Sequence, residues 1–414
     1  MKEILKQTIT GGTRILIPLM VLSLSLIFTF CVSDVSAASG DIIYVNGSSG
    51  NDSWDGQSAA WVSGTTGPKL SIKNATGTVN SGGTVNIANG NYKGINNTKI
   101  IINKDMNIIG QSQTGTIING TDSAWIFKIQ SGVTVAIKNL TLANGEADNG
   151  GAIYNDGSLT ITGCNFSDNI VNSTNYLEYP VDGFGGAIYN NGTLIVDNSN
   201  FTSNGAFFGG GAIHNTGDST VTGSNFIDNH VIQGGYGGGA ISNNGILKVT
   251  DSTFINNDAY ACGGAIYNHN ELTVIDSDFK GNAAYAAGGA IYNICILTVA
   301  GSNFTNNAAY GVGDPTYIPI AGGAIYNDYG GIYTVNSSQF AGNIPQDVYN
   351  NTEPYSDDDW GYGESDGSFN DPSATVKAAS KTTKTIGLQK TGLPLNYLIL
   401  AILMVIGGLV PRRR

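Results

Sequence analysis

The stretch Gly263-Gly264-Ala265-Ile266-Tyr267-Asn268 decides the fold of this 414-residue chain, because near copies of it recur through the middle of the sequence. The seven copies begin at Gly150, Gly185, Gly210, Gly238, Gly263, Gly288 and Gly322. A phenylalanine follows the first glycine by 16 residues in six copies and by 18 in the last: Phe166, Phe201, Phe226, Phe254, Phe279, Phe304 and Phe340. The shortest interval between copies, 25 residues, occurs three times. Such a fixed period predicts a stacked solenoid, in which each unit buries its apolar face against its neighbours.

Each unit reads as short strands joined by tight turns. Residues 271–275 (Glu-Leu-Thr-Val-Ile) alternate between polar and apolar, and glycine, asparagine, aspartate and serine stand at the junctions. This alternation is typical of strands and not of helices. Roughly three strands of four to five residues, with three corners, use up one repeat. We therefore predict an all-β fold, a right-handed parallel β-helix solenoid of about ten turns.

The same alternation predicts which side chains face the core. We expect four apolar positions of the repeat to point inward, namely Ile266, Leu272, Val274 and Phe279. Tyr267 is expected to face outward, because His214 and Ser242 replace it in two copies without disturbing the pattern.

Two further regularities concern the corners. Asn268 and Asn282 recur in register, which predicts ladders of side-chain amides along the stack. The repeated glycines are expected where the backbone takes a positive φ or approaches a neighbour closely.

Differences in repeat length fall in three stretches before the next Gly-Gly, at 172–181, 233–237 and 311–319. Insertions confined to one corner put their loops on one edge, which in repeat proteins is often the binding face.

The two ends of the chain read as targeting and anchoring segments. Basic residues precede an apolar run at 15–30, and Val35-Ser36-Ala37 offers a small-residue cleavage site. This pattern predicts a secretory signal peptide, which would remain as an N-terminal anchor if it were not cleaved. Residues 393–410 carry no charge and precede three arginines. They predict a single membrane-spanning helix, with the arginines cytoplasmic and the β-helix outside the cell.

Residues between these ends complete the domain plan. A strand at Ile42–Val45 and a helix over 68–75 are expected to cover the first turn of the solenoid. After Phe340 the repeat stops, and an acidic stretch followed by a Ser/Thr/Ala/Lys segment predicts a disordered stalk. The predicted segments are a signal peptide (1–37), a capping segment (39–80), the β-helix (81–345, regular from 150), the stalk (346–392), the transmembrane helix (393–410) and a basic tail (411–414).

The charge balance limits the partners of the exterior part. Residues 39–411 hold 13 lysines, no arginine and 29 acidic residues, a formal net charge of −16. Nucleic acid and anionic lipid are poor partners for such a field. Thirteen Asn-x-Ser/Thr sequons suit a secreted glycoprotein, among them Asn46, Asn139, Asn165, Asn200 and Asn303. Cys164, Cys262 and Cys295 remain after cleavage and are not in register, so we predict free thiols.

The sequence offers little support for a catalytic role. Lyases of the β-helix type need a basic residue near the substrate carboxylate, whereas the exterior segment has no arginine. Hydrolases need two carboxylates at a set distance; the nearest candidates are Asp251, Asp276 and Asp278. Asn198 and Gly163 stand at the equivalents of Asp251, so the pairing looks incidental. His214, His230 and His269 fall at unrelated turn positions, so we predict no metal site, no cofactor and no enzyme activity.

Tyrosines are the better candidates for binding. Five occupy one predicted outward position, namely Tyr154, Tyr189, Tyr267, Tyr292 and Tyr326. Three more, Tyr260, Tyr285 and Tyr310, form a second file before the next repeat. Flat aromatic files can stack on sugar rings or anchor a protein partner. Alternatively, the rings simply stack on each other and stiffen the rod.

The doubled motif also carries a resemblance. Gly-Gly-Ala-Ile at 288–291 with Phe-x-x-Asn at 304–307 resembles the repeats of the chlamydial polymorphic outer membrane proteins, which are surface adhesins with a β-helical passenger. The overall plan, with Lys-Thr-Gly-Leu-Pro at 390–394 before an apolar helix, also resembles the adhesin-like proteins of methanogenic archaea. The resemblance covers residues 41–345 and the tail. It implies a pectate-lyase-like β-helix and a role in adhesion, without catalytic residues to transfer.

These observations lead to one functional hypothesis with two rivals. We expect a membrane-anchored, adhesin-like cell-surface protein whose β-helical rod binds glycans or neighbouring cell envelopes. The first rival is an extracellular polysaccharide lyase or hydrolase on the same fold. The second is a purely structural component of the envelope.

Overall fold

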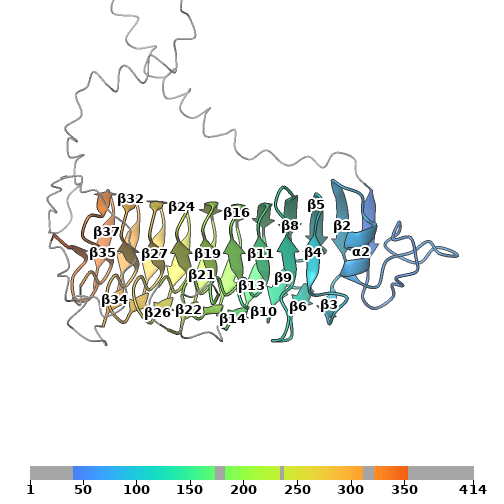
Figure 1. Cartoon of the computed structure of the whole chain (residues 1–414), viewed down its shortest axis with the longest axis horizontal. Helices are drawn as coiled ribbons and strands as arrows, with labels where there is room; N and C mark the ends of the chain where they lie inside the picture. The colour runs from blue at the N-terminus through green and yellow to red at the C-terminus, as the bar shows by residue number, and fades with distance from the viewer. Residues whose placement is uncertain (1–40, 173–181, 234–236, 311–320, 353–414) are drawn as a thin grey trace, which may run out of the picture.

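The computed structural model describes residues 41–172, 182–233, 237–310 and 321–352, which wind into a rod of stacked parallel strands (Figure 1). Two long sheets form its broad sides. The wide sheet contains β1 (Ile42–Val45), β2 (Gly83–Ile87), β5 (Met106–Gly110), β8 (Thr134–Lys138), β12 (Ser158–Thr162), β16 (Thr193–Asp197), β20 (Asp218–Thr222), β24 (Ile246–Thr250), β28 (Glu271–Ile275), β32 (Ile296–Ala300) and β36 (Ile332–Asn336). The phenylalanine sheet contains β3 (Gly90–Lys93), β6 (Thr116–Asn119), β9 (Thr141–Ala143), β13 (Asn165–Ser167), β17 (Asn200–Thr202), β21 (Asn225–Ile227), β25 (Thr253–Ile255), β29 (Asp278–Lys280), β33 (Asn303–Thr305) and β37 (Gln339–Ala341).

Two further sheets complete each turn. The tyrosine sheet contains β4 (Ile100–Ile102), β7 (Phe127–Ile129), β11 (Ile153–Asn155), β15 (Ile188–Asn190), β19 (Ile213–Asn215), β23 (Ile241–Asn243), β27 (Ile266–Asn268), β31 (Ile291–Asn293), β35 (Ile325–Asn327) and β38 (Val348–Asn350). The short sheet contains β10 (Glu146–Ala147), β14 (Ile170–Val171), β18 (Gly205–Ala206), β22 (His230–Val231), β26 (Asp258–Ala259), β30 (Ala283–Ala284) and β34 (Ala308–Ala309). The predicted all-β parallel solenoid of about ten turns is confirmed.

The number of strands per turn differs from the expectation. Four strands, not three, make up a regular turn, because the short sheet adds a two-residue strand before each Gly-Gly. A two-residue strand is too short to show an alternation in the sequence. Its second residue is buried in a small separate cluster formed by Val171, Ala206, Val231 and Ala259.

Equivalent side chains stack on one another in the interior. Phe279 lies between Phe254 and Phe304, with ring centroids 4.7 Å and 4.8 Å away and nearly parallel planes. All four predicted inward positions are buried, with exposures of 0% for Ile266, Leu272 and Val274 and 1% for Phe279. In the phenylalanine column each ring therefore packs against the same kind of ring on both sides.

Asparagine ladders hold the corners, as predicted. After the tyrosine sheet, Asn268 Nδ2 donates to Asn293 Oδ1 at 2.7 Å, and the chain of amides extends from Asn155 to Asn350. After the phenylalanine sheet, Asn257 Nδ2 donates both to Asn282 Oδ1 and to the Phe226 carbonyl. These side chains are buried, and buried backbone groups at bends need such partners.

The paired glycines have two separate roles. The first has a positive φ, +66° at Gly263, where a side chain would be strained. The second lies against the backbone of the next turn: a Cβ on Gly264 would come within 2.1 Å of the Gly289 carbonyl oxygen. Gly-Gly is therefore required by backbone shape and close stacking.

The predicted insertions attach at one corner of the rod. The insertions follow β14, β22 and β34, all in the short sheet, and precede tyrosine-sheet strands. Most of their residues, 173–181, 234–236 and 311–320, lie outside the described residues.

The N-terminal segment packs on the first turn. β1 has the predicted bounds and pairs with β2 as the first strand of the wide sheet. The helix begins later than predicted, as α2 (Ile72–Thr78), because Lys69 instead exchanges backbone hydrogen bonds with β1 at Tyr44 and Asn46. Ile72 and Ala75 of α2 are fully buried in the main core.

Several predicted segments lie outside the described residues, among them the signal peptide, most of the stalk, the transmembrane helix and the basic tail. Among the residues that the structure describes, no helix has the length and apolar character needed to cross a membrane. The last strand, β38, lies just beyond the predicted end of the β-helix at 345 and pairs with β35.

Replacing a stacked core ring should be costly. We expect Phe279→Ala to lower the free energy of unfolding by about 3–5 kcal/mol, because it leaves a cavity between two rings. The exposed Tyr260, at 53%, provides the matched aromatic control, and Tyr260→Ala should cost less than about 1 kcal/mol. Urea unfolding followed by circular dichroism measures both, and equal losses would contradict the inside/outside assignment.

Breaking an amide ladder should also be costly. Asn257 Oδ1 accepts from the Asn229 backbone and side chain, so Asn257→Leu leaves the backbone N–H and one of the two side-chain N–H groups of Asn229 buried without a partner. We expect a loss of about 3 kcal/mol or more in the free energy of unfolding. Asn256→Gly, at the adjacent exposed position with φ of +52°, should change it by less than about 1 kcal/mol. A neutral Asn257→Leu substitution would mean that the ladder contributes little.

Candidate functional site

One tyrosine file is open to solvent. Tyr260, Tyr285 and Tyr310 are 53%, 39% and 59% exposed and directly follow β26, β30 and β34. Each backbone N–H donates to a carbonyl of the preceding turn, which fixes the spacing of the file. Adjacent ring centroids are 5.6 Å and 6.5 Å apart. The file lies at the corner where the insertions attach, so it forms an aromatic edge on the rod.

The other tyrosine file is covered, which corrects the prediction that it faces outward. Tyr154 and Tyr189 are half-buried, whereas Tyr267, Tyr292 and Tyr326 are only 8%, 4% and 0% exposed. The cause is the segment before the next Gly-Gly, which folds over the outer side of the tyrosine sheet and packs Cys262, Ala287 and Ala321 against the rings. The sequence pattern showed that these tyrosines leave the central core, but not that a second apolar layer covers them.

Contacts within this covered file favour stacking over ligand binding. The Tyr292 and Tyr326 rings lie 4.9 Å apart with an interplanar angle of 4°. The Tyr292 hydroxyl donates to Asp328 Oδ2 at 2.6 Å. At the other end, Lys128 Nζ lies 4.7 Å from the centroid of Tyr154. A ligand would have to displace these contacts to reach Tyr267, Tyr292 or Tyr326.

His214 and Ser242 interrupt the covered file. The Phe184 ring lies 4.6 Å from the imidazole of His214, which is buried. His214 Nδ1 and Ser242 Oγ have no hydrogen-bond partner among the described residues. Because burial penalises the charged imidazolium, the pKa of His214 falls to about 3.

The candidate carboxylates occupy a turn position. Asp251 and Asp276 are exposed and have φ of +49° and +46°, as does Asn198 at +47° in an earlier turn. Asparagine, aspartate and glycine are the residues that tolerate this conformation, so backbone shape accounts for the file. Asp278 Oδ1 accepts a hydrogen bond from Asn303 Nδ2 at 2.7 Å.

Histidine and cysteine do not converge in the described part of the chain. No group of three or more His, Cys, Asp or Glu side chains there has the geometry to hold a metal ion. Cys164, Cys262 and Cys295 are free thiols. Burial raises the pKa of both Cys164 and Cys262 to about 12, so these two thiols stay protonated and unreactive.

The candidate glycosylation sites differ in their surroundings. Asn165 and Asn200 lie in an outer amide column, where Asn200 Nδ2 donates to Asn165 Oδ1 at 2.9 Å. Asn303 is paired with Asp278 in the same column, and Asn139 is exposed in a turn with φ of +53°. Asn46 Oδ1 accepts from the hydroxyl of Ser48, the third residue of its own sequon, at 2.8 Å.

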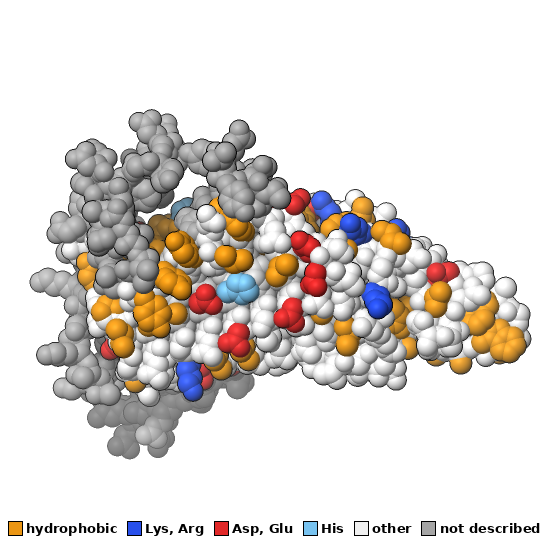
Figure 2. Space-filling model, turned by 90° about the horizontal axis from the view of Figure 1, so that it is seen from below, with side chains coloured by type: hydrophobic (Ala, Val, Ile, Leu, Met, Phe, Trp, Pro, Cys, Tyr) orange, Lys and Arg blue, Asp and Glu red, His pale blue; other side chains and the backbone are white. Residues whose placement is uncertain are grey.

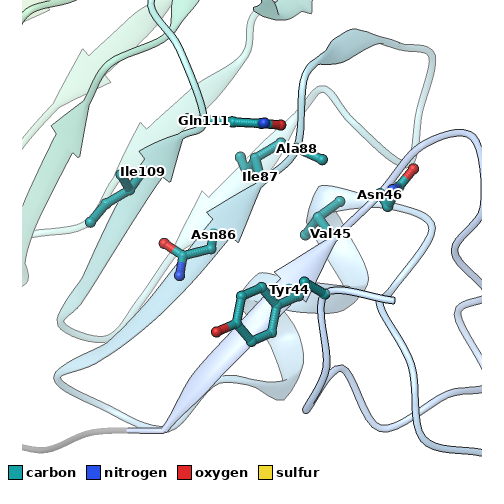
Figure 3. Close-up of a pocket in the computed structure, with 10 residues that line it drawn as sticks. Tyr44, Val45, Asn46, Asn86, Ile87, Ala88, Ile109 and Gln111 are labelled. Atoms are coloured by element: carbon teal, nitrogen blue, oxygen red, sulfur yellow. The ribbon is translucent and has the colours of Figure 1, made fainter. Parts of the chain in front are cut away.

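A hollow near the N-terminal end was not found from the sequence. It has a volume of about 420 Å³ and lies on the outer face of β1, β2 and β5. Tyr44, Asn46, Asn86 and Gln111 line it (Figure 3). These residues lie before the regular repeats begin, where no recurring position draws attention to them.

The buried histidine predicts an acid-sensitive stability. The unfolded imidazole has a pKa of about 6.5 and the folded one a lower value. Protons therefore favour the unfolded chain, and this contribution to stability is lost as pH falls below about 6.5. Thermal unfolding between about pH 8 and pH 5 should show a smaller fall in midpoint for His214→Tyr, which restores the residue found in neighbouring turns. Equal falls for the two proteins would rule out His214 as the source.

Comparison with known proteins agrees with the repeat pattern. Residues 251–269 and 276–294 match the model of the Chlamydia polymorphic membrane protein repeat. No curated protein and no solved structure matches the chain, so the resemblance to adhesin-like proteins of methanogens stays a prediction. The two matched segments run through β27 and β31 and include the Gly-Gly-Ala-Ile element of both turns. In these segments the chain carries the polymorphic membrane protein repeat that its paired motifs indicated.

Proposed function

We propose that this protein is an adhesin-like cell-surface protein whose β-solenoid binds glycans or neighbouring cell envelopes. The observation that carries the proposal is the exposed file of Tyr260, Tyr285 and Tyr310 at the corner of the insertions. Exposed aromatic rings at fixed spacing are costly to leave in water and are typical of binding surfaces. The repeat shared with Chlamydia polymorphic membrane proteins supports a surface-associated role.

The electrostatics of the rod narrow the choice of partner. Figure 2 shows acidic side chains across the middle of one face, with few cationic ones. Tyr260, Tyr285 and Tyr310 bring polar hydroxyls and flat apolar faces, without a charge of their own. A neutral or weakly cationic partner is therefore favoured over nucleic acid or an anionic membrane. Sugar rings meet these conditions, since their faces stack on aromatic rings and their hydroxyls accept and donate hydrogen bonds.

The placement of the rod at the cell surface is part of the proposal. The signal peptide at 1–37 would direct export, and the apolar segment at 393–410 would anchor the chain in a membrane. The segment at 39–80 would act as the cap, since its residues Lys69, Ile72 and Ala75 meet the first strand and the core. Of the five sequons named above, Asn139 is exposed and outside the amide columns, which makes it the best acceptor for a glycan among them.

A purely structural role is the second candidate. It is favoured by the continuous stacks of phenylalanine and covered tyrosine, which stiffen the rod without any ligand. We propose no catalytic role, because the candidate carboxylates Asp251 and Asp276 are accounted for by turn geometry.

The exposed tyrosines provide the test. We expect the full chain with Tyr260→Ala, Tyr285→Ala and Tyr310→Ala combined to lose at least about ten-fold in affinity for a glycan array or for isolated cell envelopes. The matched control is Ile246→Ala with Ile296→Ala, which removes side chains of similar exposure, 49% and 46%, from the wide sheet. Unchanged binding of the triple variant would refute the tyrosine file as the binding surface.

Two other outcomes decide between the rivals. Wild-type protein that binds neither glycans nor envelopes but forms ordered lattices would favour the structural role. New reducing or unsaturated ends in a polysaccharide panel, lost on Asp251→Asn or Asp276→Asn, would favour an enzyme.

A further inference from the structure

We propose that the hollow at the N-terminal end of the wide sheet is a second binding site, specific for a short neutral saccharide. It lies on a surface other than the exposed tyrosine file and does not rest on that file. Three properties of the hollow favour this role: its shape, the chemistry of its lining and the rigidity of its floor.

The shape follows from the register of three strands. Tyr44, Asn86 and Ile109 are in-register partners on β1, β2 and β5, and they form one column on the outer face. Two residues further on, Asn46, Ala88 and Gln111 line the second column (Figure 3). The small side chain of Ala88 stands in the middle rung between the larger Asn46 and Gln111. The hollow therefore opens above Ala88. Ala59, in the loop between β1 and α2, also lines it.

The lining offers hydrogen bonds without charge. Asn46 Oδ1 already accepts from Ser48 and Ser49, and Gln111 Oε1 accepts from the Asn89 backbone. Each of these two amides therefore has its NH₂ group left to donate. The side-chain amide of Asn86 makes no hydrogen bond to another described residue, so both its carbonyl and its NH₂ group are available.

This lining selects a class of ligand. None of the ten residues lining the hollow is charged. In the register a lysine lies one rung beyond the lining on either side, Lys138 next to Ile109 and Lys69 next to Val45. The Lys69 side chain is buried, and its ammonium group donates to the Asp52 carbonyl. A phosphate, a carboxylate or an ammonium group would lose its hydration without gaining a counter-charge. Sugar hydroxyls both donate and accept, which matches amides and a phenol, and the half-buried Tyr44 ring offers a face for a sugar ring. The volume of about 420 Å³ lies within the range of small-molecule sites.

The floor of the hollow is held in place, so the site is preformed. The β1 backbone is hydrogen-bonded on its outer edge, where Tyr44 N–H donates to the Gly56 carbonyl and Asn46 N–H to the Lys69 carbonyl. Beneath the floor, the buried Tyr92 hydroxyl donates to the Ala88 carbonyl at 2.9 Å. A preformed site avoids the entropic cost of ordering its residues when a ligand binds.

The test fills the hollow without altering its hydrogen-bonding groups. We expect the full chain, kept in a detergent without a sugar headgroup, to bind at least one of maltose, cellobiose, lactose or chitobiose on an array. Their uronic acid and sulfated counterparts should bind at least about ten-fold more weakly. Ala88→Phe should abolish binding of the neutral sugar, whereas Thr298→Phe, on the same sheet face in β32, should leave it unchanged. Circular dichroism melting curves establish that both variants are folded.

Two further variants keep the proposal open to refutation if Ala88→Phe misfolds. Asn86→Ala and Gln111→Ala should each weaken binding about two- to ten-fold, the effect of one lost hydrogen bond. No neutral sugar bound at millimolar concentration, a preference for the charged counterparts, or binding that survives in folded Ala88→Phe would overturn the proposal.

The sequon at Asn46 adds an independent readout. A glycan attached to Asn46 would itself occupy the hollow, because the side chain lines it. Mass spectrometry of the peptide that contains Asn46 should therefore find it unmodified. Complete glycosylation of Asn46 would overturn the proposal without bearing on the tyrosine file. Conversely, a triple tyrosine variant that loses affinity for glycans or envelopes and still binds the neutral disaccharide in the hollow would show that the two sites are independent.

Discussion

The in-register stacking of equivalent residues is the constraint on which the whole rod depends. A corner in a parallel solenoid removes backbone groups from the sheets and buries them, and each must find a partner. The buried asparagines supply it, since Asn257 bonds both the Phe226 carbonyl and the next amide in the ladder. A shift of one residue in any turn would break this ladder, the phenylalanine stack and the glycine contact together. Insertions are therefore tolerated at the corner before Gly-Gly, where no ladder passes.

The two corner ladders share one direction, and this gives the rod a polarity. Each amide donates toward the C-terminal end, from Asn155 to Asn190 in one ladder and from Asn169 to Asn204 in the other. Aligned amide dipoles add, as they do in a helix, so the C-terminal end of each ladder presents an N–H donor that no further ladder amide accepts. At that end Asn343 Nδ2 donates to Asp347 Oδ1 at 3.0 Å. A carboxylate thus terminates one ladder in the way that an acidic residue caps a helix N-terminus.

The repeat made most of the architecture predictable, and the places where prediction failed have physical reasons. Strict spacing indicated the parallel stack, the inward Phe279 and the ladder through Asn268. The fourth sheet was missed because a two-residue strand such as Asp258–Ala259 leaves no alternation to detect. Tyr267 was predicted to be exposed to solvent because histidine and serine occupy its position in two other turns. In fact this variation reflects a second apolar layer, in which Phe184 packs beside His214 and Cys262 beside Tyr267.

Repetition makes the architecture predictable, but it leaves few side chains free to bind a ligand. Where a residue recurs in every turn, as the covered tyrosines nearly do, its neighbours recur as well and occupy its contacts, so the side chain becomes part of the stack. Tyr292 illustrates this, because both of its ring faces meet other tyrosines. Free hydrogen-bonding groups instead collect where the repeat is imperfect. At β2 the outer column places Asn86 beside Tyr44 and Ile109, three residues that cannot form a ladder with each other. Irregular rungs are therefore the places where a solenoid of this kind keeps chemistry available for a ligand.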